Sequence, residues 1–372
     1  MKRHLLLLTA ALLFVITAAA SLSPAQVKTK SVERETDFDE AGQEDIINRD
    51  LWESIRKTPY ETALRHIEDV KERSRPKAGT MVLPNGWQIA PAGNQTEVGR
   101  LPMEAISFAG QIVVLNAGYY SNDKPEISVV DPRSDQVVRI LRVAGLYPGA
   151  AVEPGGDLFI SGGVGKKIFR FDKEFRQVRE YDVNGFVAGL AAIDADHIAA
   201  VYLVAAGTPE DFQKGVYREG RVAILNTTTG IVEHEVSAGF YPQAVQFQAG
   251  KLYVTLSGEN KVRIFDTELS PVGEIVVGKT PQNMCTDDKR LFVVNQNSDD
   301  ISVVDAQSDK VASSISVAWP GSKFGSAPTS CTVSAGRLYV TQANTNDVAV
   351  VDLRTSLVTG YIPTGFYPTK VL

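Results

Sequence analysis

The chain has 372 residues, a formal net charge of −6, 44% hydrophobic residues and 22% charged residues. This balance is typical of a globular protein with a large core, and it excludes disorder and collagen-like structure. Loss of a leader containing Lys2 and Arg3 would lower the net charge to about −8, which repels polyanions, so we expect no nucleic-acid partner. The 30 Gly and 18 Pro favour many short strands, and so an all-β protein.

Residues 1–25 have the pattern of a secretory signal peptide. A basic start precedes an apolar run from Leu5 to Ala20, and small residues continue to Ala25. The run is short for a membrane span, although an uncleaved anchor is the alternative. We therefore predict cleavage after Ala20 or Ala25, a periplasmic or secreted product, and no stable membrane span after cleavage.

Residues 26–79 are predicted to form a charged spacer followed by two short amphipathic helices. Ile47, Leu51 and Ile55 recur at helical spacing, and a second apolar stripe runs from Tyr60 to Val70. Two helices this short cannot form a core, so we expect their apolar faces to pack on the following domain or on a partner.

A five-residue repeat organises the remainder, residues 80–372. The pattern is apolar-x-apolar-apolar-Asp, with Asn in one copy, and it ends at Asp131, Asp172, Asn226, Asp266, Asp305 and Asp352. The intervals are 41, 54, 40, 39 and 47 residues, and the two long ones contain insertions. A period of about 40 residues is typical of propeller blades.

Each repeat is predicted to contain four strands. A proline opens the first strand, an apolar run forms the second, the Asp pattern is the third, and a Val-rich run is the fourth. Four-stranded antiparallel units at this period close radially. The predicted fold class is therefore an all-β, seven-bladed β-propeller with an incomplete last blade, preceded by the short helical segment.

The seventh blade is expected to be shared between the two ends of the repeat region. Trp87–Ala90 and Gln95–Gly99 would supply two outer strands, and Tyr367–Leu372 would start the innermost one. Because the second strand of that blade is missing, either the polypeptide is truncated or something else completes the blade.

The second-strand segments carry a family resemblance. Leu252-Tyr-Val-Thr255, Leu291-Phe-Val-Val-Asn295 and Leu338-Tyr-Val-Thr341 resemble the Tyr-Val-Thr-Asn (YVTN, YncE-like) repeats of exported β-propellers. Leu83-Pro-Asn-Gly-Trp87 resembles the segment that opens the propeller in a bacterial group with a following alkaline-phosphatase-like domain. The resemblance implies a propeller, but it carries over no phosphoesterase residues, because the domain holding them is not in these 372 residues.

Cys285 and Cys331 are the two cysteines of the chain. An oxidising compartment permits a disulfide. However, their offsets from the preceding prolines differ, so we favour two buried thiols over a bridge.

The sequence offers few catalytic groups. Apart from His4, the histidines are His66, His197 and His234, which are too scattered for a dinuclear metal site. No haem-binding, nucleophile-elbow or phosphate-loop motif occurs. We therefore predict no cofactor, no metal site and no catalytic residue, and we lean against an enzyme.

One face of the propeller is the candidate ligand-binding face. This face carries the links, the segments that join the fourth strand of one repeat to the first strand of the next and the second strand to the third. In three links a tyrosine precedes the proline that opens the next repeat. Aromatic, polar and charged residues occupy other links and the insertion 207–220. The candidate residues are Tyr147, Tyr241, Tyr367, Trp319, Asn295, Asn297, Asn344, Asn346, Phe212, Tyr217 and Arg218. For the tyrosines we favour packing over binding. For the Asn residues we favour capping of the local backbone.

These observations support three functions. The first is an exported binding or interaction scaffold that recognises a small ligand or a protein partner without catalysis of its own. The second is the non-catalytic propeller half of a phosphoesterase whose catalytic domain lies elsewhere. A lactonase is a weaker third alternative, since it rests on fold analogy alone.

Overall fold

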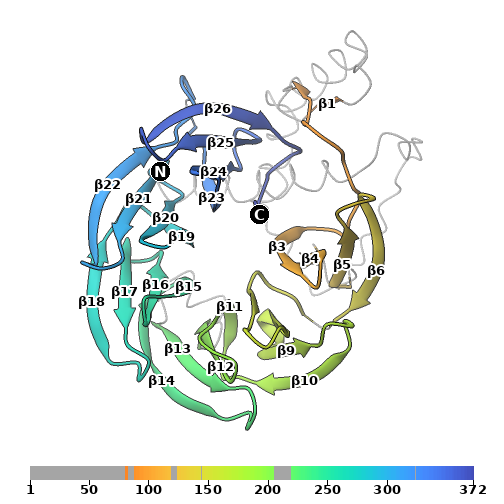
Figure 1. Cartoon of the computed structure of the whole chain (residues 1–372), viewed down its shortest axis with the longest axis vertical. Coiled ribbons are helices and arrows are strands. Elements are labelled where there is room, and N and C mark those ends of the chain that lie inside the picture. The colour runs from red at the N-terminus through yellow and green to blue at the C-terminus, as the bar shows by residue number, and fades with distance from the viewer. Residues whose placement is uncertain (1–79, 83–87, 119–123, 144, 205–218, 323) are drawn as a thin grey trace, which may run out of the picture. The chain divides into compact units, whose positions relative to one another are not determined.

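The computed structural model describes residues 80–82, 88–118, 124–143, 145–204, 219–322 and 324–372. The chain divides into two units, Met1–Pro91 and Ala92–Leu372. In the first unit, β1 (Met81–Val82) pairs antiparallel with β2 (Gln88–Ile89). The second unit contains six four-stranded sheets, called blades 1 to 6 in chain order below (Figure 1).

The strands of each blade follow one another in sequence and pair in that order. Blade 1 comprises β3 (Pro102–Phe108), β4 (Gln111–Asn116), β5 (Glu126–Asp131) and β6 (Gln136–Arg142), and blade 2 comprises β7 (Ala150–Val152), β8 (Leu158–Ser161), β9 (Lys167–Phe171) and β10 (Gln177–Asp182), with a 3₁₀ turn at Gly163–Gly165. Blade 3 comprises β11 (Phe186–Ala192), β12 (His197–Leu203), β13 (Glu219–Asn226) and β14 (Val232–Phe240), and blade 4 comprises β15 (Pro242–Gln248), β16 (Lys251–Leu256), β17 (Lys261–Phe265) and β18 (Pro271–Val276). Blade 5 comprises β19 (Pro281–Thr286), β20 (Arg290–Asn295), β21 (Asp300–Asp305) and β22 (Lys310–Ser316), and blade 6 comprises β23 (Pro328–Ser334), β24 (Arg337–Gln342), β25 (Asp347–Asp352) and β26 (Leu357–Pro363).

The blades are arranged radially, with the first strand of each nearest the centre and the fourth at the rim (Figure 1). Neighbouring first strands contact one another from β3 through β7, β11, β15 and β19 to β23. The middle strands are buried, as in β20, whereas the outermost β22 is largely exposed. Second and third strands accordingly read as continuous apolar runs, because neighbouring blades cover both of their faces.

The core lies between adjacent blades. One cluster joins Phe159 and Ile168 of blade 2 to Val187 and Tyr202 of blade 3, and all four side chains are fully buried. Similar clusters join blades 1 and 2, 3 and 4, 4 and 5, and 5 and 6. Each blade is therefore stabilised chiefly by packing on the sheets that neighbour it in sequence, as in other repeat folds.

The Asp or Asn that defines the repeat caps the turn between the third and fourth strands. In blade 5, Asp305 Oδ1 accepts hydrogen bonds from the backbone N–H groups of Gln307 and Ser308, at 3.1 and 2.7 Å. The bond from the N–H two residues further along the chain recurs at Asp131, Asp172, Asn226, Asp266 and Asp352. This residue type is repeated because a short side-chain acceptor closes the turn locally.

The predicted number of seven blades is wrong: the described chain forms six. Gln88–Ile89 pairs with Met81–Val82 rather than with a propeller strand, and neither 95–99 nor 367–372 forms a strand. A four-stranded sheet needs its second strand to join the first to the third, and among the described residues no segment takes that place for a seventh sheet.

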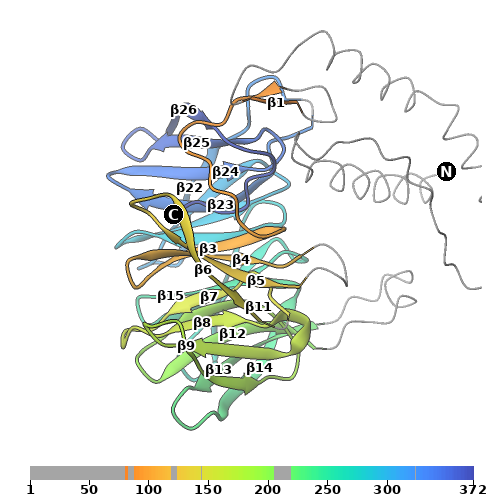
Figure 2. The same cartoon turned by 90° about the vertical axis from the view of Figure 1, so that its right-hand side faces the viewer.

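Two irregular segments join blade 6 to blade 1 instead. On the outer side, Ala92 N–H donates to Pro363 O at 2.9 Å, and Thr96 Oγ1 donates to Asp135 O at 2.8 Å. On the inner side, residues 364–372 lie between β23 and β3, where both views place the C-terminus (Figure 1, Figure 2). There Thr369 Oγ1 donates to Pro102 O at 2.9 Å.

The predicted signal peptide, spacer and pair of helices at 1–79 lie outside the described residues. Within the described ranges the chain forms no α-helix. The preference for free thiols is wrong, because Cys285 of β19 and Cys331 of β23 form a disulfide with a Cα–Cα distance of 5.7 Å. The bridge is possible because the two innermost strands of blades 5 and 6 lie side by side.

Candidate functional site: the central cavity

The innermost strands enclose a central cavity with a volume of about 300 Å³. Many of its side chains follow a proline that opens a repeat. These post-proline residues are Met103, Gly149, Gln243, Gln282, Thr329 and Thr369. The repeat therefore brings one equivalent position from several blades, and from the C-terminal segment, to the same space.

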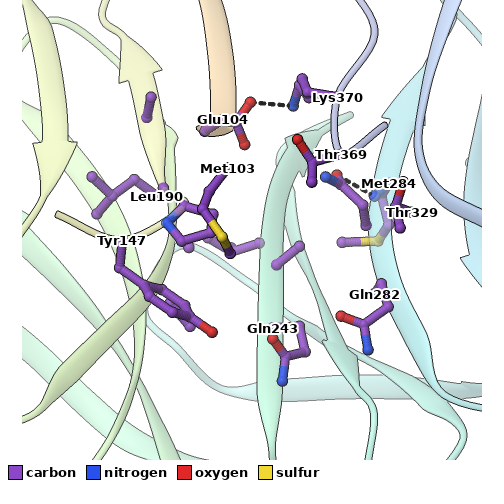
Figure 3. A pocket seen from close by; sticks show the side chains of 18 of the residues that line it. Met103, Glu104, Tyr147, Leu190, Gln243, Gln282, Met284, Thr329, Thr369 and Lys370 are labelled. Carbon is purple, nitrogen blue, oxygen red and sulfur yellow. Dashed lines mark hydrogen bonds and ion pairs between the residues drawn. The ribbon is translucent and has the colours of Figure 1, made fainter. Parts of the chain in front are cut away.

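The lining is uneven in chemistry. Gln243 and Gln282 extend their side-chain amides into the cavity from the neighbouring strands β15 and β19 (Figure 3). Met103, Met284 and Leu190 contribute apolar surface. The cavity thus presents hydrogen-bonding groups beside apolar groups, a combination typical of small-molecule sites.

Glu104 and Lys370 are the two charged residues in the lining, and they neutralise each other. Lys370 Nζ lies 2.7 Å from Glu104 Oε1, and the two side chains are 22% and 11% exposed, respectively. The pair joins the C-terminal segment to blade 1 and leaves the cavity wall without net charge (Figure 3).

The glutamine amides are largely free of partners within the protein. Among the described residues, the side chains of Gln282 and Gln296 make no hydrogen bond, and Gln243 Nε2 lies 3.5 Å from Ser257 Oγ, at the limit for such a bond. Thr329 Oγ1, in contrast, donates to Pro368 O at 3.0 Å. Thr329 therefore joins blade 6 to the C-terminal segment, whereas the glutamine amides are available to a ligand.

The links above the cavity have an unusual backbone. Five residues that precede a repeat-opening proline have a positive φ, between 50° and 56°: Leu101, Tyr241, Thr280, Ala327 and Tyr367. This region is unfavourable for non-glycine residues. Neighbouring polar side chains hold several of these links: Asn260 Oδ1 accepts from Thr280 N–H at 2.9 Å, and Asn346 Oδ1 accepts from Tyr367 N–H at 2.9 Å.

The structure brings two of the three predicted tyrosines to the cavity. Tyr147 and Tyr367 line it, whereas Tyr241 does not. Tyr147 is half-buried against Phe186, with ring centroids 4.4 Å apart, and burial raises the pKa of its hydroxyl. Tyr147 therefore stays protonated and can donate a hydrogen bond at neutral pH.

Three other predicted residues have structural contacts. Trp319 packs on the Tyr361 ring at 4.3 Å and lines neither described cavity. Asn295 is buried, and its Nδ2 donates to Asp300 Oδ1 at 2.8 Å. Asn346 is buried beneath the Tyr367 link. The Asn295 and Asn346 side chains thus bond a neighbouring segment rather than the backbone beside them.

Asn297 and Asn344 lie together at a second hollow of about 330 Å³. Gln296 lines both this hollow and the central cavity, so the two adjoin. Phe324 also lines it, with 87% of its surface exposed. The remaining predicted residues, Phe212, Tyr217 and Arg218, lie outside the described residues.

The sequence analysis missed Gln243, Gln282 and the Glu104–Lys370 pair. The available signal was the Pro-Gln dipeptide, which occurs at Pro242-Gln243 and again at Pro281-Gln282. The aromatic residue before the proline was the predicted one, whereas the residue after the proline lines the central cavity.

Within the described part of the chain, no group of three or more His, Cys, Asp or Glu side chains is placed to hold a metal ion. No helix there is long and apolar enough to cross a membrane.

The fold places the protein in the class of β-propellers. Within that class, the choice-of-anchor I domain family matches residues 155–370, more than half of the chain, and the chain belongs to this family. The family assignment suggests a cell-surface or secreted protein. No curated protein matches the chain.

Several solved propellers share the fold at low sequence identity. Hydrazine synthase from Kuenenia stuttgartiensis is 14% identical, with a TM-score of 0.58 over 75% of this chain and 91% of that chain. Streptogramin B lyase is 15% identical, with a TM-score of 0.52 over 68% of this chain and 80% of that chain. The WD40 repeats of RRP9 are 10% identical, with a TM-score of 0.58 over 73% and 83%. These likenesses support the fold alone.

Proposed function

We propose that this propeller is the ligand-binding domain of an exported protein, and that it binds a small molecule in the central cavity without catalysis of its own. The observation that carries the proposal is the group of glutamine amides, Gln243, Gln282 and Gln296, which line the cavity with little or no hydrogen bonding to the described protein. Each amide faces the cavity with both donor and acceptor groups open to water, and a ligand with matching polar groups could replace that water.

Rigidity of the surrounding links also supports the proposal. Asn346 and Asn260 hold links above the cavity in a strained backbone conformation. A site whose shape exists before binding loses less conformational entropy when its ligand arrives.

For localisation, we propose that residues 1–25 direct export, and that the mature protein acts in the periplasm or outside the cell. Membership of the Tyr-Val-Thr-Asn repeat group belongs to the same proposal. The phosphoesterase half and the lactonase remain alternative predictions, and a hydrolase encoded next to this chain would favour the first of them.

The proposal can be tested by differential scanning fluorimetry. The full chain would be screened against neutral sugars, zwitterionic amino acids, dicarboxylates and nucleosides. We expect at least one compound to raise the Tm of the wild type and to do so less in Gln243→Met and Gln282→Met. If no class raises the Tm, or if the shift in both variants is as large as in the wild type, the central cavity is not the binding site.

A further inference from the structure

We infer that the ligand is a neutral carbohydrate, with a terminal sugar ring in the central cavity and the next sugar against Phe324. This inference rests on the proposed function. Its first support is size: the cavity of about 300 Å³ has the volume of about ten water molecules at about 30 Å³ each, which is enough for one sugar ring.

In the central cavity, charge favours an uncharged sugar ring. Glu104 and Lys370 already pair at 2.7 Å and are mostly buried. A charged ligand would therefore be desolvated without an unpaired counter-charge, or would have to break this pair, and both are costly. An uncharged molecule avoids that penalty.

The hydrogen-bonding groups match hydroxyls. Each glutamine side chain presents one acceptor oxygen and two N–H donors, and each sugar hydroxyl both donates and accepts. Gln243 and Gln282 extend from neighbouring strands into one space (Figure 3). The adjacent Met103, Met284 and Leu190 side chains provide apolar contacts for the C–H surface of a sugar ring.

The second hollow extends the site. Because Gln296 lines both hollows, a molecule in the central cavity can continue past this residue towards Phe324. The Phe324 ring is 87% exposed, and Asn344 Nδ2 donates to the Phe324 carbonyl oxygen at 3.3 Å, which fixes the backbone of that link. An exposed ring beside amide groups is suited to contact the apolar face of a second sugar.

Isothermal titration calorimetry on the full chain tests the inference. The probes are glucose, galactose, mannose and N-acetylglucosamine, the disaccharides maltose, cellobiose and lactose, the zwitterion glutamine, and the charged compounds lysine and succinate. We expect a neutral sugar to bind and a disaccharide to bind more tightly. Gln282→Met should raise the Kd of both by about tenfold, the loss of one or two hydrogen bonds.

Two variants act as controls. Gln177→Met makes the same chemical change on the exposed strand β10 and should leave the Kd unchanged. Phe324→Ala should weaken the disaccharide about fivefold and leave the monosaccharide unaffected, as expected for loss of one aromatic contact. An equal loss for both sugars would overturn the placement of the second sugar.

The remaining outcomes separate the inference from the proposed function. Binding of a charged probe that is weakened by Gln282→Met would overturn the carbohydrate assignment and leave the cavity as a binding site. If none of the probes binds, the carbohydrate assignment is wrong, and the fluorimetric screen with nucleosides then decides the proposed function. Circular dichroism and the Tm of each variant would show that it is folded.

Discussion

Asp347 provides a test of how buried charge acts in this fold. The residue begins β25 and is only 3% exposed, and neither carboxylate oxygen has a hydrogen-bond partner among the described residues. Burial raises its pKa from 3.8 to about 6, against a smaller opposing effect of the Thr345 hydroxyl. Burial and, second, the Asp347 charge raise the pKa of the Tyr361 phenol.

The equivalent residue of blade 5 is fully partnered. Asp300 Oδ1 accepts from Asn295 Nδ2 and Ser298 Oγ, both at 2.8 Å, and Oδ2 accepts from Ser314 Oγ at 2.9 Å. In blade 6, Tyr361 replaces Ser314 in the strand register. The same position therefore carries a stabilised carboxylate in one blade and an isolated one in the next.

Asp347→Asn should stabilise the protein at neutral and alkaline pH. The rise in pKa from 3.8 to about 6 corresponds to about 3 kcal/mol of unfavourable free energy for the charged form, and screening by nearby water reduces this to about 1 to 3 kcal/mol. Because the folded state binds the proton more tightly, stability falls as pH rises from about 4 to about 6 and stays low above it. The gain in the variant should follow the same window.

The assay is urea unfolding of the two proteins at pH 4, 5, 6 and 8, with circular dichroism as the signal. We expect nearly equal unfolding free energies at pH 4 and a gain of about 1 to 3 kcal/mol for Asp347→Asn at pH 8. The matched control is Asp300→Asn, which loses charge-assisted hydrogen bonds and should destabilise by about 1 to 2 kcal/mol. A pH-independent effect of Asp347→Asn, or a loss at pH 8 as large as the control's, would refute the reasoning.

Three further changes test the contacts that hold the ring. Replacing Cys285 and Cys331 by Ser should lower the unfolding free energy by about 4 kcal/mol, because the bridge spans 46 residues; equal urea midpoints with and without reductant in the wild type would contradict this. A double-mutant cycle of Glu104→Gln and Lys370→Met should give a coupling energy of about 1 kcal/mol that weakens in high salt; zero coupling would show that the pair does not join the ring. Asn346→Ala removes the acceptor of a link N–H and should cost about 1 to 2 kcal/mol in urea unfolding; an unchanged midpoint would argue against it.

Local signals accounted for most of the fold that the sequence predicted. The Asp at the end of the third strand closes its own turn, so the repeat is visible wherever that Asp recurs, as at Asp305. Apolar runs such as Leu291–Val294 are buried because neighbouring sheets cover both faces. Strand order and the propeller class follow from this period and need no knowledge of distant contacts.

The number of blades depended on contacts that the sequence does not display. Gln88–Ile89 carries the strand pattern that a seventh blade would use, but it pairs with its own neighbour in the chain. Residues 364–372 lie between blades 6 and 1 through side-chain contacts such as Thr369 to Pro102. A strand pattern indicates that a segment can pair, but only the tertiary structure decides its partner.

For the candidate site, too, some features follow from the sequence and others only from the tertiary structure. The sequence by itself determined the repeat, the all-β class and the links on one face, because these depend on residues close together in the chain. The tertiary structure decided that Gln243, Gln282 and Gln296 line one cavity, that Cys285 meets Cys331, and that Asp347 has lost its partners. Each of these results depends on which residues of different blades or strands meet in space, and packing alone sets that.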